Sequence, residues 1–134
     1  MITTKGRYAL RVMIDLAEHG EKGLVPLKEI AERQEISKKY LEIIVRELVS
    51  GGLVIGYSGK GGGYKLSRNP EDYTAGEILE LMEGTLAPVA CLVCGAEACS
   101  RAADCKTLPM WAEYAELTHN FFYSKTLKDL AQIS

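Results

Sequence analysis

The chain has 134 residues, of which 47% are hydrophobic and 25% are charged, a composition typical of soluble globular proteins. This length allows one compact domain, or a small domain with an appended helix. No apolar run approaches the roughly 20 residues that cross a bilayer, and no apolar signal segment opens the chain, so we expect a cytoplasmic protein that does not contact a membrane. No Ser/His/Asp set, adjacent Cys/His pair or obvious pair of carboxylates is present, so we expect no enzymatic activity.

The formal net charge of −2 is unevenly distributed along the chain. Residues 1–68 carry twelve Lys or Arg and eight Asp or Glu, whereas residues 69–134 carry four and ten. A basic front half joined to an acidic back half is typical of a protein that binds nucleic acid through one part. A chance division of surface charge would explain the same counts equally well.

Three helices are predicted in the first fifty residues. Apolar side chains at three- and four-residue steps predict a first helix capped by Thr3 or Thr4. A short second helix begins at residues 25–27. After a four-residue turn, Ser37 is a natural N-cap for a third helix over residues 38–50, which the following glycines end.

A hairpin is predicted next, with strands over residues 53–57 and 64–67 and a glycine-rich turn over 58–63. Three helices followed by a hairpin indicate a winged helix-turn-helix. The predicted fold is therefore mainly α with a small β-hairpin wing. We expect a DNA-binding domain over residues 1–68, then a sensor loop and dimerisation helices, including a long C-terminal one, over residues 69–134.

The third helix has one apolar face and one polar face, and the polar face is a candidate for the major groove of DNA. Glu42 on that face is tolerable near phosphates if it accepts a hydrogen bond from a base such as cytosine, although pairing with Arg46 one turn later is an equal alternative. The candidate DNA-binding residues are Lys38, Lys39, Glu42, Ile43 and Arg46 on this helix, and Ser58, Lys60 and Gly61 in the wing.

All four cysteines lie within fifteen residues, in the pattern C-x2-C-x4-C-x5-C formed by Cys91, Cys94, Cys99 and Cys105. Their irregular spacing on a loop favours an iron–sulfur cluster. The alternatives are a zinc site, for which only the first pair resembles a knuckle, free redox-sensing thiols, and disulfides, which need an oxidising compartment. An iron–sulfur electron-transfer protein would also explain the cysteines, but it would leave the basic helix and the glycine wing without a role.

The last part of the sequence predicts two helices and a short terminal one. Thr74 and Glu77 have the spacing of a capping box, and Thr126 with Asp129 can cap the last helix. A long helix beginning near residues 107–109 carries a wide apolar stripe. A second copy of the chain would cover this stripe more easily than intrachain packing would, and the candidate dimerisation residues are Trp111, Tyr114, Phe121 and Phe122.

The sequence resembles the bacterial IscR/NsrR/CymR family of winged-helix regulators over essentially its whole length. The resemblance rests on short matches spread along the chain and on the wing sequence Gly-Lys-Gly-Gly-Gly-Tyr at residues 59–64 together with the downstream cysteines. The other matching segments are residues 5–9, 25–27, 30–31, 36–37, 40–42, 52–54, 76–78, Trp111 and 126–130.

This resemblance implies a homodimer that binds a palindromic operator in double-stranded DNA. It also implies that a cluster, where present, adjusts DNA binding in response to iron–sulfur supply, nitric oxide or redox state. Cys91, Cys99 and Cys105 match the three cysteine ligands of the family, and Glu42 matches a position that reads DNA in some members.

The fourth ligand departs from the patterns of the family. Leu108 stands where members with a two-iron cluster often have a His, and Arg7 and Tyr8 stand where members with a four-iron cluster have a carboxylate. Ser58 stands where the wing often has an Arg. Cys94 is therefore the candidate fourth ligand, with a spectator or redox-active thiol as the alternative. We expect a [2Fe-2S] cluster rather than a [4Fe-4S] cluster.

Overall fold

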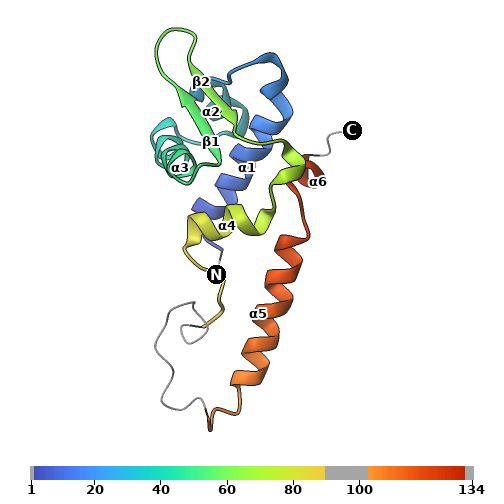
Figure 1. Ribbon diagram of the computed structural model, residues 1–134. Helices are drawn as coiled ribbons and strands as arrows, with labels where there is room; N and C mark the ends of the chain where they lie inside the picture. The colour runs from blue at the N-terminus through green and yellow to red at the C-terminus, as the bar shows by residue number, and fades with distance from the viewer. Residues whose placement is uncertain (1, 90–102, 132–134) are drawn as a thin grey trace.

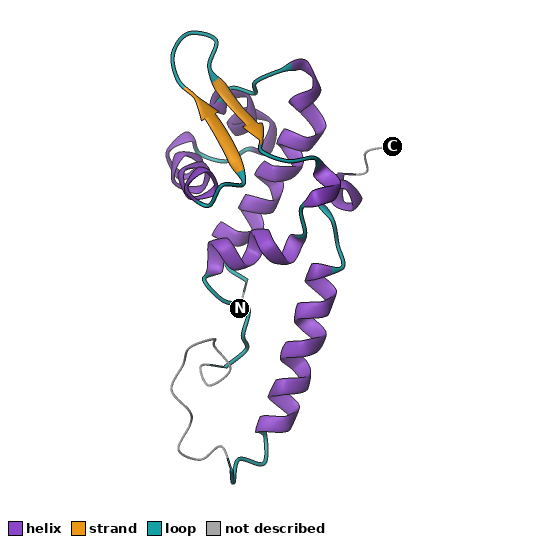
Figure 2. Cartoon of the chain, viewed as in Figure 1, coloured by secondary structure: helices purple, strands orange, loops and turns teal. Residues whose placement is uncertain are grey.

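The computed structural model describes residues 2–89 and 103–131, which form a helical head, a hairpin wing and a long helix that extends away from both (Figure 1). Figure 2 shows the wing at one end of the molecule and the long helix at the other. No described helix is long and apolar enough to cross a membrane. In chain order the elements are α1 (Thr4–His19), η1 (Gly20–Lys22), α2 (Leu27–Gln34), α3 (Lys38–Ser50), β1 (Val54–Tyr57), β2 (Gly63–Leu66), η2 (Pro70–Asp72), α4 (Ala75–Glu83), α5 (Leu108–Tyr123) and α6 (Leu127–Ala131).

The predicted starts of α1 and α3 are confirmed. The side-chain oxygen of Thr3 accepts a hydrogen bond from the amide of Gly6, and that of Ser37 accepts one from the amide of Tyr40. Each cap satisfies an amide that has no partner within its own helix. Between α2 and α3 the chain turns through Glu35, whose φ of 54° lies in the left-handed region and ends α2.

The wing is an antiparallel pair in which Val54 faces Leu66 and Tyr57 faces Gly63. β1 begins one residue later than predicted, because the amide of Leu53 still bonds to the carbonyl of Leu48 at the end of α3. β2 begins one residue earlier than predicted, at Gly63. A side chain there would collide with the backbone of Val25, which adds a single bridge to β2 beside Gly63.

One hydrophobic core joins elements from both sides of residue 68. Four fully buried apolar side chains of this core lie along one face of α1. Helices α4 and α6 pack against the same helix. The core therefore joins the elements of residues 1–68 to the helices that follow them. Its fully buried side chains include Val12, Met13, Leu16, Ile30, Leu41, Ile44, Val45, Leu48, Tyr73, Ile78 and Leu127.

The capping box predicted for α4 is only half formed. The Thr74 hydroxyl accepts from the amide of Glu77 at 3.1 Å. The carboxylate of Glu77 does not return this bond but accepts two from the Arg68 guanidinium, at 2.8 and 2.9 Å. A charged fork is a stronger donor than a neutral amide, which explains the difference.

At α6 the predicted cap is complete. The Thr126 amide donates to the carboxylate of Asp129, whose own amide donates to the Thr126 hydroxyl, both at 3.0 Å. The hydrogen bond from the backbone amide of Thr126, followed by that from its side chain, lowers the pKa of the Asp129 carboxyl.

The long helix α5 contacts the head chiefly near its C-terminal end. There the ring of Tyr123 lies against Gly76 of α4, at a distance that leaves no room for a side chain on the glycine. Burial and the neighbouring Glu80 carboxylate raise the pKa of Tyr123 to about 12. No residue of α5 is buried in the described part of the chain, and the helix projects away from the head (Figure 1).

Candidate nucleic-acid interface and cysteine segment

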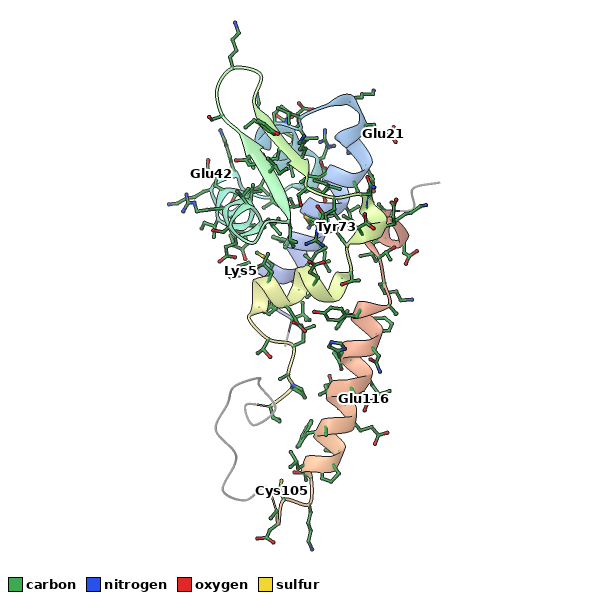
Figure 3. All side chains as sticks on the ribbon, viewed as in Figure 1. Lys5, Glu21, Glu42, Tyr73, Cys105 and Glu116 are labelled. Carbon is green, nitrogen blue, oxygen red and sulfur yellow. The ribbon has the colours of Figure 1, made fainter. Side chains whose placement is uncertain are left out.

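The polar face of α3 is exposed along its whole length. The five side chains predicted to face DNA, from Lys38 to Arg46, are all exposed, while the opposite face of the helix is buried in the core. Figure 3 shows Glu42 on the outer flank of the head. No ion pair joins Glu42 to Arg46 among the described residues, so the alternative of a helix-face pair finds no support in this arrangement.

An open groove of about 550 Å³ separates α3 from the wing. Glu42 and Arg46 line it from the helix, and Ser58 lines it from the wing. Arg46 and the hydroxyls of Tyr57 and Ser58 are donors that can contact a sugar–phosphate backbone, whereas the Glu42 carboxylate in the same groove repels phosphate. Sequence reasoning missed further lining residues on α3 and the wing and at the start of α2, namely Leu27, Val45, Val49, Ser50, Gly56, Tyr57 and Tyr64.

Tyr57 is an exposed aromatic residue among those that sequence reasoning missed. It ends β1 next to the turn, is exposed, and has the ammonium group of Lys65 5.5 Å from the centre of its ring. Tyr57 is the last residue of a predicted strand, next to the glycine turn. This position was the signal that could have added it to the candidate DNA-binding residues.

The tip of the wing depends on two glycines with positive φ. Gly59 has a φ of 90° and Gly61 a φ of 79°, in the region that other residues rarely adopt. The amide of Gly62 closes the turn by donating to the carbonyl of Gly59 at 3.0 Å. This turn holds Lys60 at the exposed tip, where its ammonium can reach a phosphate.

A buried carboxylate on α1 fixes the orientation of α2. The side chain of Asp15 is fully buried and accepts two bonds from Arg33, at 2.8 and 2.9 Å, and one from Gln34 at 2.9 Å. Burial alone would raise the pKa of Asp15, but the bonds from Arg33 and Gln34 hold this pKa below its ordinary value. Arg11 binds the side chain and carbonyl of the same glutamine, so α1 and the C-terminal end of α2 are locked together next to the turn into α3.

Of the four cysteines, Cys105 is described, and Cys91, Cys94 and Cys99 lie outside the described residues. Cys105 is close to the free end of α5, far from the wing (Figure 3). Its sulfur is 3.4 Å from the hydroxyl of Thr107. That hydroxyl, followed by the backbone amides of Thr107 and Leu108, lowers the pKa of the Cys105 thiol. The thiolate is the form that binds a metal, so the position favours a ligand. No group of three metal-binding side chains gathers within residues 2–89 and 103–131.

The apolar surface of α5 is larger than the sequence prediction. Tyr114 and Phe121 are exposed, whereas Trp111 and Phe122 are half-buried and make edge contacts with them. Two residues that sequence reasoning missed, Met110 and Leu117, share the exposed face, and Leu117 is 64% exposed. The spacing of positions 110, 114, 117 and 121 follows the four-three-four pattern of a helix-pairing seam, which was the available signal.

Comparison with known proteins places these features in a family. The sequence model of Rrf2, described as an iron-dependent transcriptional regulator, matches residues 2–133. The chain is 38% identical over 129 residues to protein rrf2 of Nitratidesulfovibrio vulgaris, a match that covers 96% of this chain and 85% of that protein. It is 36% identical over 129 residues to the HTH-type transcriptional regulator IscR of Pectobacterium atrosepticum, covering 96% of this chain and 77% of the regulator.

Solved structures of similar proteins have the same fold. CymR, the global cysteine regulator of B. subtilis, superposes with a TM-score of 0.82 at 35% identity, covering 100% of this chain and 98% of the other. IscR of T. potens gives a TM-score of 0.77 at 35% identity, and the match covers 98% of this chain and 86% of the other. The oxidised form of CymR from Staphylococcus aureus gives a TM-score of 0.77 at 32% identity, and the match covers 100% of this chain and 98% of the other.

Proposed function

The chain belongs to the Rrf2 family of DNA-binding transcription regulators, and from this membership we propose that it is a homodimer whose operator affinity is controlled by a cysteine-ligated iron–sulfur cluster. The family and the winged helix-turn-helix account for DNA binding. The observation that carries the sensing part is the set of four cysteines within fifteen residues of the chain.

In this proposal the two DNA-contacting elements have separate tasks. Lys38 and Lys39 lie at the N-terminal end of α3, where residues of a recognition helix reach base edges in the major groove. Glu42 reads a base donor one turn further on. Lys60 and the backbone of Gly61 hold the wing against phosphates, and Arg46 faces the strand that passes through the groove between them.

The ligands that we propose are Cys91, Cys99 and Cys105, with Cys94 as the fourth. When bound, the cluster supplies soft iron sites for thiolates and an electron count that oxidants and nitric oxide alter. Cys105 fits this role because its thiol pKa is lowered and the side chain is accessible. It lies three residues before α5, so fixing this cysteine also fixes the first turn of the helix.

We assign the exposed face of α5 to the homodimer. Tyr114, Leu117 and Phe121 are each more than half exposed and lie on one side of a helix that the head does not cover. A second copy offers the same stripe in a self-complementary way. Two recognition helices related by the dimer axis would then meet two half-sites of a palindromic operator.

The deciding experiment measures iron, inorganic sulfide and the visible absorption spectrum of protein purified without oxygen. We expect a coloured protein with iron and sulfide in equal amounts, and operator affinity that changes when the iron is removed. Replacing Cys99 with Ala should abolish the chromophore and leave a folded dimer. A colourless protein that contains zinc, or an operator affinity that is the same with and without iron, would refute the proposal.

A second candidate is a regulator that senses through its thiols without a metal. It is favoured by the relatives described as a global cysteine regulator and as an oxidised form of CymR. This candidate predicts that peroxide or a disulfide reagent changes DNA affinity in protein that contains no iron. The two candidates are separated by repeating the DNA titration with iron-free protein before and after oxidation.

A further inference from the structure

Tyr73 lies where the wing meets the helices of the second half of the chain. We propose that its hydroxyl is the positioning contact through which residues 69–134 set the orientation of the wing on DNA. This inference rests on the sensing function proposed above, because it names the route by which a change near the cysteines reaches the wing.

The hydroxyl of Tyr73 binds the backbone directly before the first wing strand and directly after the second. It donates to the carbonyl of Leu53 at 2.7 Å, directly before β1. It accepts from the amides of Ser67 at 2.9 Å and Arg68 at 3.0 Å, directly after β2. The Ser67 hydroxyl also lies 3.1 Å from this oxygen, and it donates to the carbonyl of Gly52 at 2.7 Å. A single oxygen atom therefore fixes where both strands leave the head.

The backbone of Tyr73 is bound to the C-terminal helices of the chain. Its carbonyl accepts from the amide of Leu127 at the start of α6, at 3.0 Å. Two residues later, the amide of Ala75 at the start of α4 donates to the carbonyl of Lys125, at 2.8 Å. These bonds connect the residue to the segment that joins α5 to α6. Figure 3 shows Tyr73 at this junction, between the wing and the long helix.

A second contact runs parallel to the first. The guanidinium of Arg68 lies 4.9 Å from the centre of the Tyr73 ring and forks onto Glu77 of α4. A shift of α4 thus acts on the end of β2 through Arg68 and on both strands through the hydroxyl. α4 in turn carries the contact between Gly76 and Tyr123, which is the attachment of α5.

Burial of the ring does not explain why this residue is a tyrosine and not a phenylalanine. Tyr73 has no exposed surface, and a phenylalanine would fill nearly the same volume without burying an oxygen. A buried hydroxyl is costly unless it is hydrogen-bonded. Three of the partners of this hydroxyl are backbone atoms where the two wing strands leave the head, and the fourth is the Ser67 hydroxyl at 3.1 Å. The hydroxyl is therefore specific for the geometry of these strands, which end at the exposed lysine of the wing tip.

The test is a double-mutant cycle on the full-length dimer with Tyr73→Phe and Lys60→Ala. The probe is a fluorescent DNA duplex selected from a randomised pool by the wild-type protein. We expect Lys60→Ala to weaken binding about fivefold in the wild-type background and less than about twofold in the Tyr73→Phe background, because a wing that is no longer positioned cannot place its lysine. Equal losses in both backgrounds would overturn the proposal.

The same proteins are then compared with and without iron. We expect the ratio of the two affinities to approach one in Tyr73→Phe while the wild type keeps its ratio. Ile78→Val removes a methyl group from the same core without touching the hydroxyl, and we expect it to keep the wild-type ratio and the wild-type effect of Lys60→Ala. If Ile78→Val behaves like Tyr73→Phe, general loosening explains the result and the proposal is wrong. If the wild type itself shows no iron dependence, the proposed sensing fails, while the cycle with Lys60 still decides the role of Tyr73.

Discussion

Replacing Asp15 with Asn should destabilise the head through the contact between α1 and α2. The substitution keeps the shape of the side chain but removes the charge that accepts two bonds from Arg33. Breaking a fully buried ion pair costs about 3–5 kcal/mol. Since the Arg33 side chain is 30% exposed and can be rehydrated, we expect a loss of about 2–3 kcal/mol in the free energy of unfolding.

Urea denaturation followed by circular dichroism at neutral pH measures this loss. Glu29→Gln is the matched control, because Glu29 pairs with the same arginine at 3.4 Å but is 53% exposed. An exposed pair of this kind contributes less than about 1 kcal/mol. Equal small losses of unfolding free energy in Asp15→Asn and Glu29→Gln would show that the buried ion pair does not stabilise the head.

The same contact has a predicted pH dependence. The folded-state pKa of Asp15 lies below its ordinary value of 3.8, so the folded protein binds this proton more weakly than the unfolded chain does. The stabilisation is therefore complete above that value and is lost as the pH falls through the lower, folded-state pKa. The stability difference between the wild type and Asp15→Asn should narrow below about pH 4.

Three further predictions concern the reading head and the dimer. Glu42→Ala should relax discrimination at one base position, measured by binding to single-base variants of the selected duplex, and a uniform loss across all variants would assign Glu42 a structural role. Leu117→Glu should convert the dimer to a monomer in sedimentation analysis without lowering the stability of the head, since this side chain is 64% exposed; a persistent dimer would place the interface elsewhere. Gly63→Ala should cost about 1–3 kcal/mol because a methyl group there meets the backbone of Val25, whereas Gly20→Ala, with nothing within 4 Å, should cost nothing measurable in thermal unfolding.

Local sequence signals were sufficient for the reading head. The caps at Thr3 and Ser37 and the periodic apolar residues determine where α1 and α3 begin and which faces they bury. The glycines of the wing turn mark the hairpin, since positive φ values are cheap only for that residue. These features depend on neighbours within a few positions, so the sequence alone contains the information.

Contacts between distant residues could not be predicted in this way. The bond between the Tyr73 hydroxyl and Leu53 joins residues twenty positions apart, and nothing near either residue signals the other. The same holds for Arg68, which competes with the local capping bond of Glu77. Membership of the cysteine site remains a prediction from spacing and resemblance, because three of the four thiols lie outside the described residues.

The attachment of α5 at one end makes it a lever. A helix of 16 residues is about 24 Å long, with Tyr123 held against Gly76 at one end and Cys105 just beyond the other. Tilting such a rod by about 10° at its pivot moves the far end by about 4 Å, several times the displacement at the pivot itself. A small shift of α4 would therefore be enlarged at the first turn of α5, three residues after Cys105.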